Sequence, residues 1–230
     1  YGQRPAGQAR EREGSEMIAD ELKPLAASWL RARFPDAHIT YELSLAEYGG
    51  AMIDVGAICP DQIVGVEIKG DGDSASRLKL QGQMYSRVCR SVYLLPSLDL
   101  LKSCKKHKPP EWRMLVPPGG DLGVHSSRRL CPSSGISWGS TYGSSDPKRG
   151  EGYGLSPAAL AAMVWTTEYG TFRVHVQEKH FTALPSRKAD FIRFVADRYP
   201  LPVIEAAVCA TLRERTWSGL KEIQYPEVTN

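Results

Sequence analysis

The chain has 230 residues, of which 42% are hydrophobic and 24% are charged, and its formal net charge at pH 7 is +3. That length and hydrophobic content allow a substantial buried core, arranged either as one domain with an appendage or as two small domains. A net charge this small excludes a chain coated in positive charge, as histone-like proteins are, but it is compatible with local basic patches.

The cysteines predict a reduced, cytosolic protein. The five cysteines are Cys59, Cys89, Cys104, Cys131 and Cys209. They form no Cys-x-x-Cys pair and have no regular spacing, which argues against a disulfide framework or a zinc site. No segment approaches the roughly 20 consecutive apolar residues that cross a bilayer, and the first residues lack an apolar signal-peptide run. We therefore expect no membrane partner.

The chain opens with a polar arm, residues 1–13, which has no hydrophobic periodicity and is predicted to be flexible. A helix is predicted from Ser15, as its N-cap, to Arg33, with a kink at Pro24. Residues 37–46 are then predicted to form a strand. Its alternation is expected to place four apolar side chains on one face, namely Ile39, Tyr41, Leu43 and Leu45.

Two short runs rich in β-branched residues predict a hairpin of buried strands, Met52–Ile58 and Gln62–Lys69. Alternation places Glu67 and Lys69 on the same face of the second strand. Because charged groups on an apolar strand cost desolvation, this pair indicates a functional site. If Asp54 lies on the same side, two carboxylates converge beside one lysine, an arrangement that can hold a hard divalent cation.

The next predicted element is a helix over Ser76–Arg90, and Ser74, in the loop before it, is the expected N-cap. Its apolar positions include Leu78, Leu80, Met84 and Val88. The same helix carries Gln81 and, four residues later, Tyr85. A further buried strand is predicted at Ser91–Leu95, which completes the order strand, strand, helix, strand.

Asp54 followed by Glu67-Ile68-Lys69 resembles the core pattern of the PD-(D/E)xK nuclease superfamily, in which an Asp precedes a Glu-x-Lys on the next strand. Gln81 and Tyr85 resemble the Gln-xxx-Tyr motif of the RecB-like branch. The resemblance implies an α/β fold with a restriction-endonuclease-like core, in which a mixed central sheet in the order αβββαβ is flanked by helices.

A closer resemblance, to MmcB-type DNA-repair nucleases and to related phage or restriction-like proteins, comes from Tyr41-Glu42-Leu43-Ser44-Leu45-Ala46 upstream of Asp54. Where those proteins carry arginines just before their Asp, this chain has Gly50-Ala51-Met52-Ile53. The resemblance covers residues 14–126. It implies a cytoplasmic bacterial or phage-encoded enzyme that processes DNA in repair, recombination or restriction, with RNA left open as a substrate and oligomers possible.

The same resemblance implies a Mg²⁺ or Mn²⁺ cofactor. Its expected ligands are Asp54, Glu67 and the backbone carbonyl of Ile68, with Glu42 or Glu16 completing the shell. Lys69 is the expected catalytic amine, with Gln81 and Tyr85 positioning it or the substrate. A structural alternative exists for both outer acids, because Glu42 suits an exposed edge strand and Glu16 suits a helix N-terminus without a metal.

Two basic groups are candidates for contacts to nucleic acid. The first group surrounds the Gln-xxx-Tyr motif and comprises Arg77, Lys79 and Arg87, and the second follows the predicted short helix Leu98–Lys102 and comprises Lys105, Lys106 and Lys108. A solvated helix surface is the alternative for both groups.

The rest of the chain is predicted to be a closing hairpin, a linker and a helical region. The hairpin comprises Trp112–Val116 and Asp121–His125, and residues 127–154, rich in Gly and Ser, form the linker. Residues 155–230 are predicted to be mainly helical, with Ser156 as an N-cap, a short strand at Thr171–Val176, and helices at Arg187–Arg198 and Pro202–Arg215. The last two helices also suit a helix-turn-helix DNA module with Arg213 and Arg215, although plain packing is the simpler interpretation.

Two rival functions remain at this point. One is a non-catalytic nucleic-acid-binding or assembly protein that retains the nuclease fold. The other treats Glu67 and Lys69 as a surface ion pair of an unrelated α/β domain, which would contribute at most about 1 kcal/mol.

Overall fold

The computed structural model describes residues 19–45, 51–116, 137–139, 154–176 and 184–217. Several predicted features lie outside these residues, among them the arm, Glu16, most of the linker and the strand predicted at Asp121–His125.

In the described part of the chain, the centre of the molecule is a six-stranded mixed sheet with the strands in sequence order. Its strands are β1 (His38–Ser44), β2 (Met52–Ile58), β3 (Ile63–Lys69), β4 (Ser91–Pro96), β5 (Arg113–Val116) and β6 (Ser137–Gly139). Strands β1, β2 and β3 are antiparallel, β4 and β5 run parallel to β3, and β6 is antiparallel to β5. The predicted α/β class and the predicted hairpin of buried strands are therefore confirmed.

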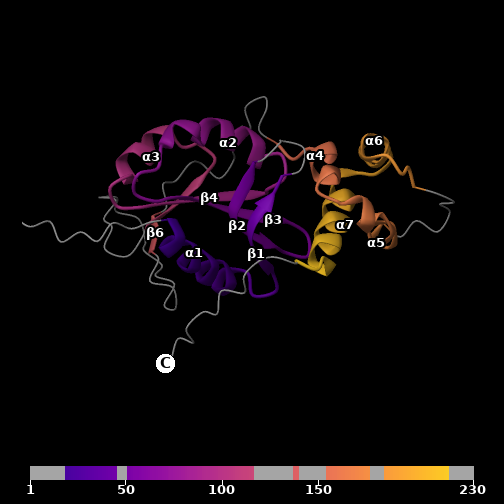
Figure 1. The fold of residues 1–230 in the computed structure, drawn as a ribbon, viewed down its shortest axis with the longest axis horizontal. Helices are drawn as coiled ribbons and strands as arrows, with labels where there is room; N and C mark the ends of the chain where they lie inside the picture. The colour runs from indigo at the N-terminus through magenta and orange to yellow at the C-terminus, as the bar shows by residue number, and fades with distance from the viewer. Residues whose placement is uncertain (1–18, 46–50, 117–136, 140–153, 177–183, 218–230) are drawn as a thin grey trace, which may run out of the picture.

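Helices cover both faces of the sheet (Figure 1). Helix α1 (Ala19–Arg33) packs Leu22, Trp29 and Leu30 onto one face. The other face is covered by the 3-10 turn η2 (Ala75–Arg77), by α2 (Leu78–Tyr85) and by α3 (Leu101–His107). Such a sheet can bury apolar strands on both faces, and β3 is buried along its whole length.

The C-terminal helices extend the core on the α2 side. They are α4 (Pro157–Ala162), α5 (Tyr169–His175), preceded by the turn η3 (Thr166–Glu168), α6 (Lys188–Arg198) and α7 (Leu201–Glu214). Their apolar side chains join those of α2, α3 and the sheet in one cluster. Arg90, just before β4, also donates to the buried carboxylate of Glu205 on α7 at 2.9 Å and 3.1 Å.

In strands β1 and β2, the apolar side chains switch from one side of the sheet to the other at one point along each strand. Ile39 and Tyr41 pack on the α1 side, whereas Leu43 joins the core on the α2 side. The switch falls at Glu42, whose φ of 53° breaks the extended alternation. In the strand register, Glu42 lies opposite Asp54, and β2 changes faces there too. The prediction that four apolar residues of the strand predicted at residues 37–46 share one face is therefore wrong.

Other predicted elements differ in extent or type. The helix predicted to reach Arg90 ends at Tyr85, and Leu80, predicted to be internal, is 58% exposed. The helix α3 begins three residues later than Leu98, and β6 lies inside the predicted linker.

In the C-terminal region, the strand predicted at Thr171–Val176 is wrong, because these residues lie in and just after helix α5. Its Phe172 is buried on one side while Val174 is exposed, an alternation that a single helical turn also produces. The N-cap at Ser156 and helices α6 and α7 are confirmed.

Candidate active site

Glu67 and Lys69 form a buried ion pair near the end of β3. Their side chains project from the same face of the strand, and Lys69 Nζ lies 2.6 Å from Glu67 Oε1. Glu67 is 2% exposed and Lys69 is 4% exposed. This burial rules out the interpretation as a surface ion pair. Holding both charges inside the protein requires further polar partners, because desolvation of an incompletely bonded pair is costly.

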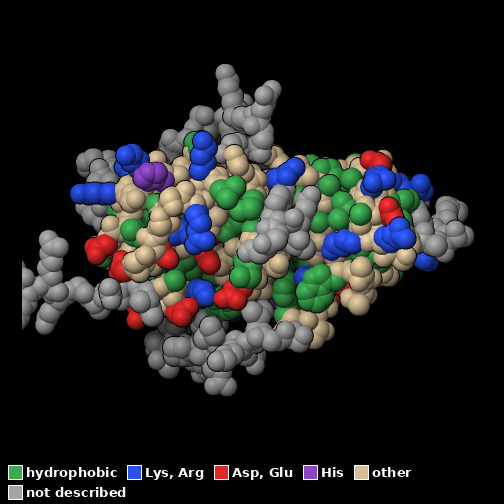
Figure 2. Space-filling model, turned by 45° about the horizontal axis from the view of Figure 1, so that its top comes forward, with side chains coloured by type: hydrophobic (Ala, Val, Ile, Leu, Met, Phe, Trp, Pro, Cys, Tyr) green, Lys and Arg blue, Asp and Glu red, His purple; other side chains and the backbone are tan. Residues whose placement is uncertain are grey.

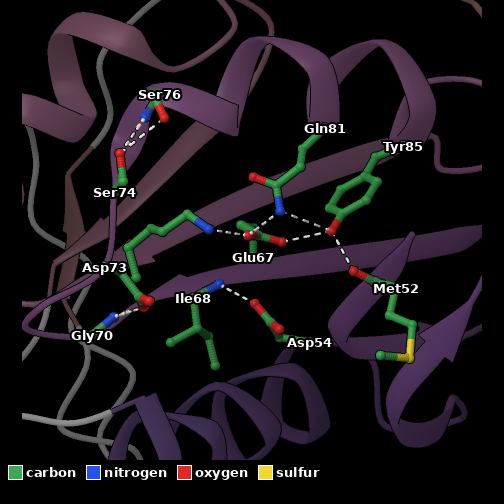
Figure 3. Close-up of polar contacts among 11 residues, drawn as sticks. Met52, Asp54, Glu67, Ile68, Gly70, Asp73, Ser74, Ser76, Gln81 and Tyr85 are labelled. Atoms are coloured by element: carbon green, nitrogen blue, oxygen red, sulfur yellow. Dashed lines mark hydrogen bonds and ion pairs between the residues drawn. The ribbon is translucent and has the colours of Figure 1, made fainter. Parts of the chain in front are cut away.

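Helix α2 supplies those partners from its inward face (Figure 3). Gln81 Nε2 donates to Glu67 Oε1 at 2.6 Å, and the Tyr85 hydroxyl lies 2.7 Å from Glu67 Oε2. Positions four apart lie on one face of a helix, which is why both side chains reach the same carboxylate. Burial and the neighbouring Glu67 charge raise the pKa of Tyr85, so the phenol stays protonated and can donate. The predicted grouping of these four residues is present.

Tyr85 also contacts the backbone carbonyl of Met52 at the start of β2. It therefore connects α2, β3 and β2 at a single hydroxyl. Its one proton serves one acceptor at a time. The amide oxygen Oε1 of Gln81 is buried and has no hydrogen-bond partner among the described residues, so an acceptor remains open beside the ion pair.

Asp54 reaches this site from β2, at the place where β2 and β3 separate. The two strands are paired from Val55 and Val66 onward, and beyond that pair the Asp54 carboxylate accepts the Ile68 N–H at 2.7 Å. Burial, followed by the Glu67 charge, raises the pKa of Asp54 from 3.8 to about 7. Lys69 and the Ile68 N–H act in the opposite direction. The two carboxylates are thus close enough to repel each other.

These groups form a donor set of the type that Mg²⁺ uses. In an extended strand, the N–H and C=O of one residue face the same neighbouring strand, so the Ile68 carbonyl also faces the gap beside Asp54. Two carboxylates and one carbonyl supply hard oxygen ligands, and Mg²⁺ keeps waters at its other positions. Within the described residues, no group of three or more acidic, His or Cys side chains is arranged to hold a metal ion.

Glu42 is the predicted outer ligand that the described residues include. It lies opposite Asp54 across the β1–β2 ladder, but its carboxylate is 3.3 Å from Lys23 Nζ of α1. Lys23, which is also 3.4 Å from Asp20, contributes positive charge near Asp54. The sequence pattern did not identify Lys23 as a residue near the site, because its proximity to Asp54 depends on how α1 packs on the sheet. Glu21, an acid of the same helix, is exposed.

The predicted basic contacts fall into two groups. Arg77, Lys79, Lys105 and Lys106 are exposed, whereas Arg87 is half-buried. Lys108 differs from its prediction, because its Nζ donates to the backbone carbonyls of Pro109 and Trp112 at 3.2 Å and 2.7 Å. Burial lowers the pKa of Lys108 as well. Its ammonium is therefore committed to the fold rather than presented to a ligand.

Arg215 is also committed to the fold, which removes it from a helix-turn-helix contact. Its guanidinium binds both carboxylate oxygens of Glu168, at 2.6 Å and 2.7 Å, and lies 4.0 Å from the ring centre of Trp165. Its side chain is 5% exposed. Arg215, just after α7, therefore packs against η3 and its N-cap Trp165, as the simpler interpretation expects.

None of the helices in the described part of the chain has the length and apolar character needed to cross a membrane. Comparisons of the chain with protein-family models, with curated proteins and with solved structures find no match in any of the three.

Proposed function

We propose that this protein is a metal-dependent nuclease that hydrolyses phosphodiester bonds in DNA. The observation that carries the proposal is the buried Glu67–Lys69 pair, which lies beside Asp54 where β2 and β3 separate. A protein has little structural reason to bury two carboxylates and an amine together, and such clusters mark functional sites. The element order α1, β1, β2, β3, α2, β4 supports a restriction-endonuclease-like core.

The metal ligands in this proposal are Asp54, Glu67 and the Ile68 carbonyl. Glu67 has room for a cation, because a carboxylate has about four acceptor positions and the described residues fill three of them. Mg²⁺ or Mn²⁺ bound there supplies positive charge to the scissile phosphate. Glu42 would reach the same site only after leaving Lys23, so we place it outside the inner ligands.

The side chains around the metal ligands have separate roles in the proposed reaction. Lys69 has three N–H donors, and Glu67 accepts one of them, so the remaining donors can bind a phosphate oxygen. Gln81 holds Glu67 through its amide nitrogen, and its open Oε1 can orient an attacking water by accepting a hydrogen bond from it. Tyr85 fixes the second oxygen of Glu67.

The test is a cleavage assay on labelled single-stranded, branched and duplex DNA, with Mg²⁺, with Mn²⁺ and with EDTA. We compare the parent with Asp54→Asn and Lys69→Met. Asp61→Asn is the control, because it removes an exposed carboxylate from the opposite end of the same hairpin. We expect cleavage that requires metal and that falls by at least about 100-fold in the two site variants, the scale typical of catalytic groups.

A second measurement reports metal binding without catalysis. Mn²⁺ should raise the melting temperature of the parent and of Asp61→Asn, and should raise that of Asp54→Asn much less. Cleavage that survives both site substitutions would contradict the proposal. Absence of cleavage on every substrate, together with metal-independent DNA binding, would instead favour a non-catalytic DNA-binding protein with this fold.

A further inference from the structure

Positive charge is concentrated in one stretch of this chain. Residues 74–110 contain eight lysines and arginines but a single acid, Asp99, which gives them a net charge of +7. Because the whole chain has a net charge of +3, the remaining residues together carry −4. The segregation is hidden in the overall composition.

The fold presents most of this charge on one layer. Five of the eight cations are exposed on η2, α2 and α3, namely Arg77, Lys79, Lys102, Lys105 and Lys106. These elements share the face of the sheet opposite α1. In Figure 2, Lys and Arg side chains lie at the upper left of the molecule with Asp and Glu mostly below them, and further Lys and Arg side chains lie at the opposite end. We call these five residues the basic face.

None of the carboxylates in the described part of the chain neutralises the basic face. No carboxylate among the described residues lies within ion-pair distance of any of its five cations. By contrast, Arg90 and Lys108 from the same stretch are bound to Glu205 and to backbone carbonyls. The fold therefore neutralises or occupies the cations that it needs for packing and leaves the basic face available to an external anion.

The basic face is continuous with the candidate active site. Arg77 is the N-cap of α2 and lies four residues, about one turn, before Gln81. Gln81 contacts Glu67, so the first cation of the basic face lies one helical turn from a residue that touches the proposed reaction centre. Lys102, Lys105 and Lys106 lie beyond it on α3, which packs against η2 and α2.

We propose that the basic face binds the phosphate backbone of a nucleic acid and guides it to the active site, without requiring metal. This inference deepens the proposed function, because it names the surface that recognises the substrate. Lysine and arginine contacts to phosphates release counterions, so the binding constant falls with salt concentration. The contacts read no bases, so we expect binding that is insensitive to sequence.

The experiment is fluorescence anisotropy in EDTA, with labelled single-stranded and duplex DNA of mixed sequence over a range of salt concentrations. The test variant is Lys105→Gln with Lys106→Gln. The matched control is Arg187→Gln with Arg193→Gln, which removes the same amount of charge from exposed positions at the start of α6 and within it. Neither pair belongs to the metal ligands or their hydrogen-bond partners, so folding and the ion pair should be preserved.

We expect the α3 variant to bind on the order of tenfold more weakly and to reduce the slope of log K against log salt by about 2. The α6 variant should bind as the parent does. Equal losses in both variants would overturn the inference, since net charge alone would then explain binding. Absence of DNA binding would also overturn the inference. A parallel measurement with phosphatidylserine vesicles identifies one such case, in which Lys105 and Lys106 are needed for binding the vesicles but the protein binds no DNA.

The outcomes also separate this inference from the proposed enzyme. DNA binding that depends on the basic face, without cleavage under any metal condition, would support the surface and reject the nuclease. Metal-dependent cleavage with a KM that is unchanged in the α3 variant would support the nuclease and reject the basic face as its substrate-binding surface.

Discussion

Tyr85 and Glu67 are joined by a hydrogen bond of 2.7 Å between the phenol of α2 and the carboxylate of β3. The same hydroxyl contacts the Met52 carbonyl, so it ties a helix to two strands that are separating from each other. The polar groups of the site are thus part of the structure that holds the sheet and α2 together.

The first prediction concerns that hydroxyl. Tyr85→Phe leaves the Glu67 oxygen and the Met52 carbonyl without this donor, and should lower the free energy of unfolding by about 1–3 kcal/mol. Tyr169→Phe is the matched control, because the Tyr169 hydroxyl is buried without a hydrogen-bond partner among the described residues. Urea unfolding measures both. A Tyr85→Phe protein as stable as Tyr169→Phe would mean that the hydroxyl contributes nothing.

The second prediction concerns the Glu67–Lys69 pair. Lys69→Met leaves a buried carboxylate without its cation and should cost about 3–5 kcal/mol, whereas the double variant with Glu67→Gln should recover part of that loss. Lys23→Met and Glu42→Gln form the comparison pair, because Glu42 is exposed and its coupling should stay below about 1 kcal/mol. Double-mutant cycles in urea give both coupling energies. Equal coupling in the two pairs would contradict the predicted effect of burial.

The third prediction is a pH dependence of stability without metal. The pKa of Asp54 is raised from 3.8 to about 7 in the folded state, so folding disfavours the ionised carboxylate. The resulting loss of folding free energy is absent below pH 3.8, where the carboxyl is protonated in both states. It grows as the pH rises from 3.8 to about 7 and is complete above that pH. Asn at this position retains an oxygen that accepts the Ile68 N–H.

Asp54→Asn should therefore be more stable than the parent at about pH 8, by on the order of 2 kcal/mol, and nearly equal to it at about pH 4. Urea unfolding in EDTA at several pH values measures the difference. Asp61→Asn controls for the loss of one negative charge. If Asp54→Asn is the less stable protein at the higher pH, the assigned burial and repulsion are wrong.

The fourth prediction concerns the packing of α2. A Cβ added at Gly82 would lie 2.2 Å from Cγ of Pro109, so Gly82→Ala forces the segment after α3 away from α2. We expect a loss of about 1–3 kcal/mol. Gly170 in α5 has no heavy atom within 4 Å of the same position, so Gly170→Ala should stabilise the protein by up to about 1 kcal/mol. Thermal unfolding of the two variants should show opposite signs.

The grouping of Glu67, Lys69, Gln81 and Tyr85 was predictable because each step depended on a local period. Alternation along β3 placed the first two on one face, and a four-residue spacing on α2 placed the other two together. The face switch at Glu42 was not predictable in this way. A non-glycine residue at φ of 53° leaves no mark in the hydrophobic pattern, so Leu43 and Leu45 were assigned to the wrong side.

Contacts between distant segments were equally hidden from the sequence. In the sequence, Lys108 belongs to a run of basic residues. In the fold, its ammonium donates hydrogen bonds to the backbone carbonyls of Pro109 and Trp112. Arg215 looked available on a terminal helix, but Glu168 and Trp165, from a segment almost 50 residues earlier, enclose it. Charge can be counted from the sequence, whereas its availability depends on tertiary structure.

The change of face at Glu42 and Asp54 has a consequence for assembly of the molecule. Each of the strands β1 and β2 contributes apolar side chains to both layers, so neither layer can be completed while the other is open. If Glu42 adopted a regular extended conformation, Leu43 would point into the layer beneath α1 and leave a void on the opposite side. The crossover thus makes the two halves of the interior a single cooperative unit, with the candidate catalytic carboxylate at their junction.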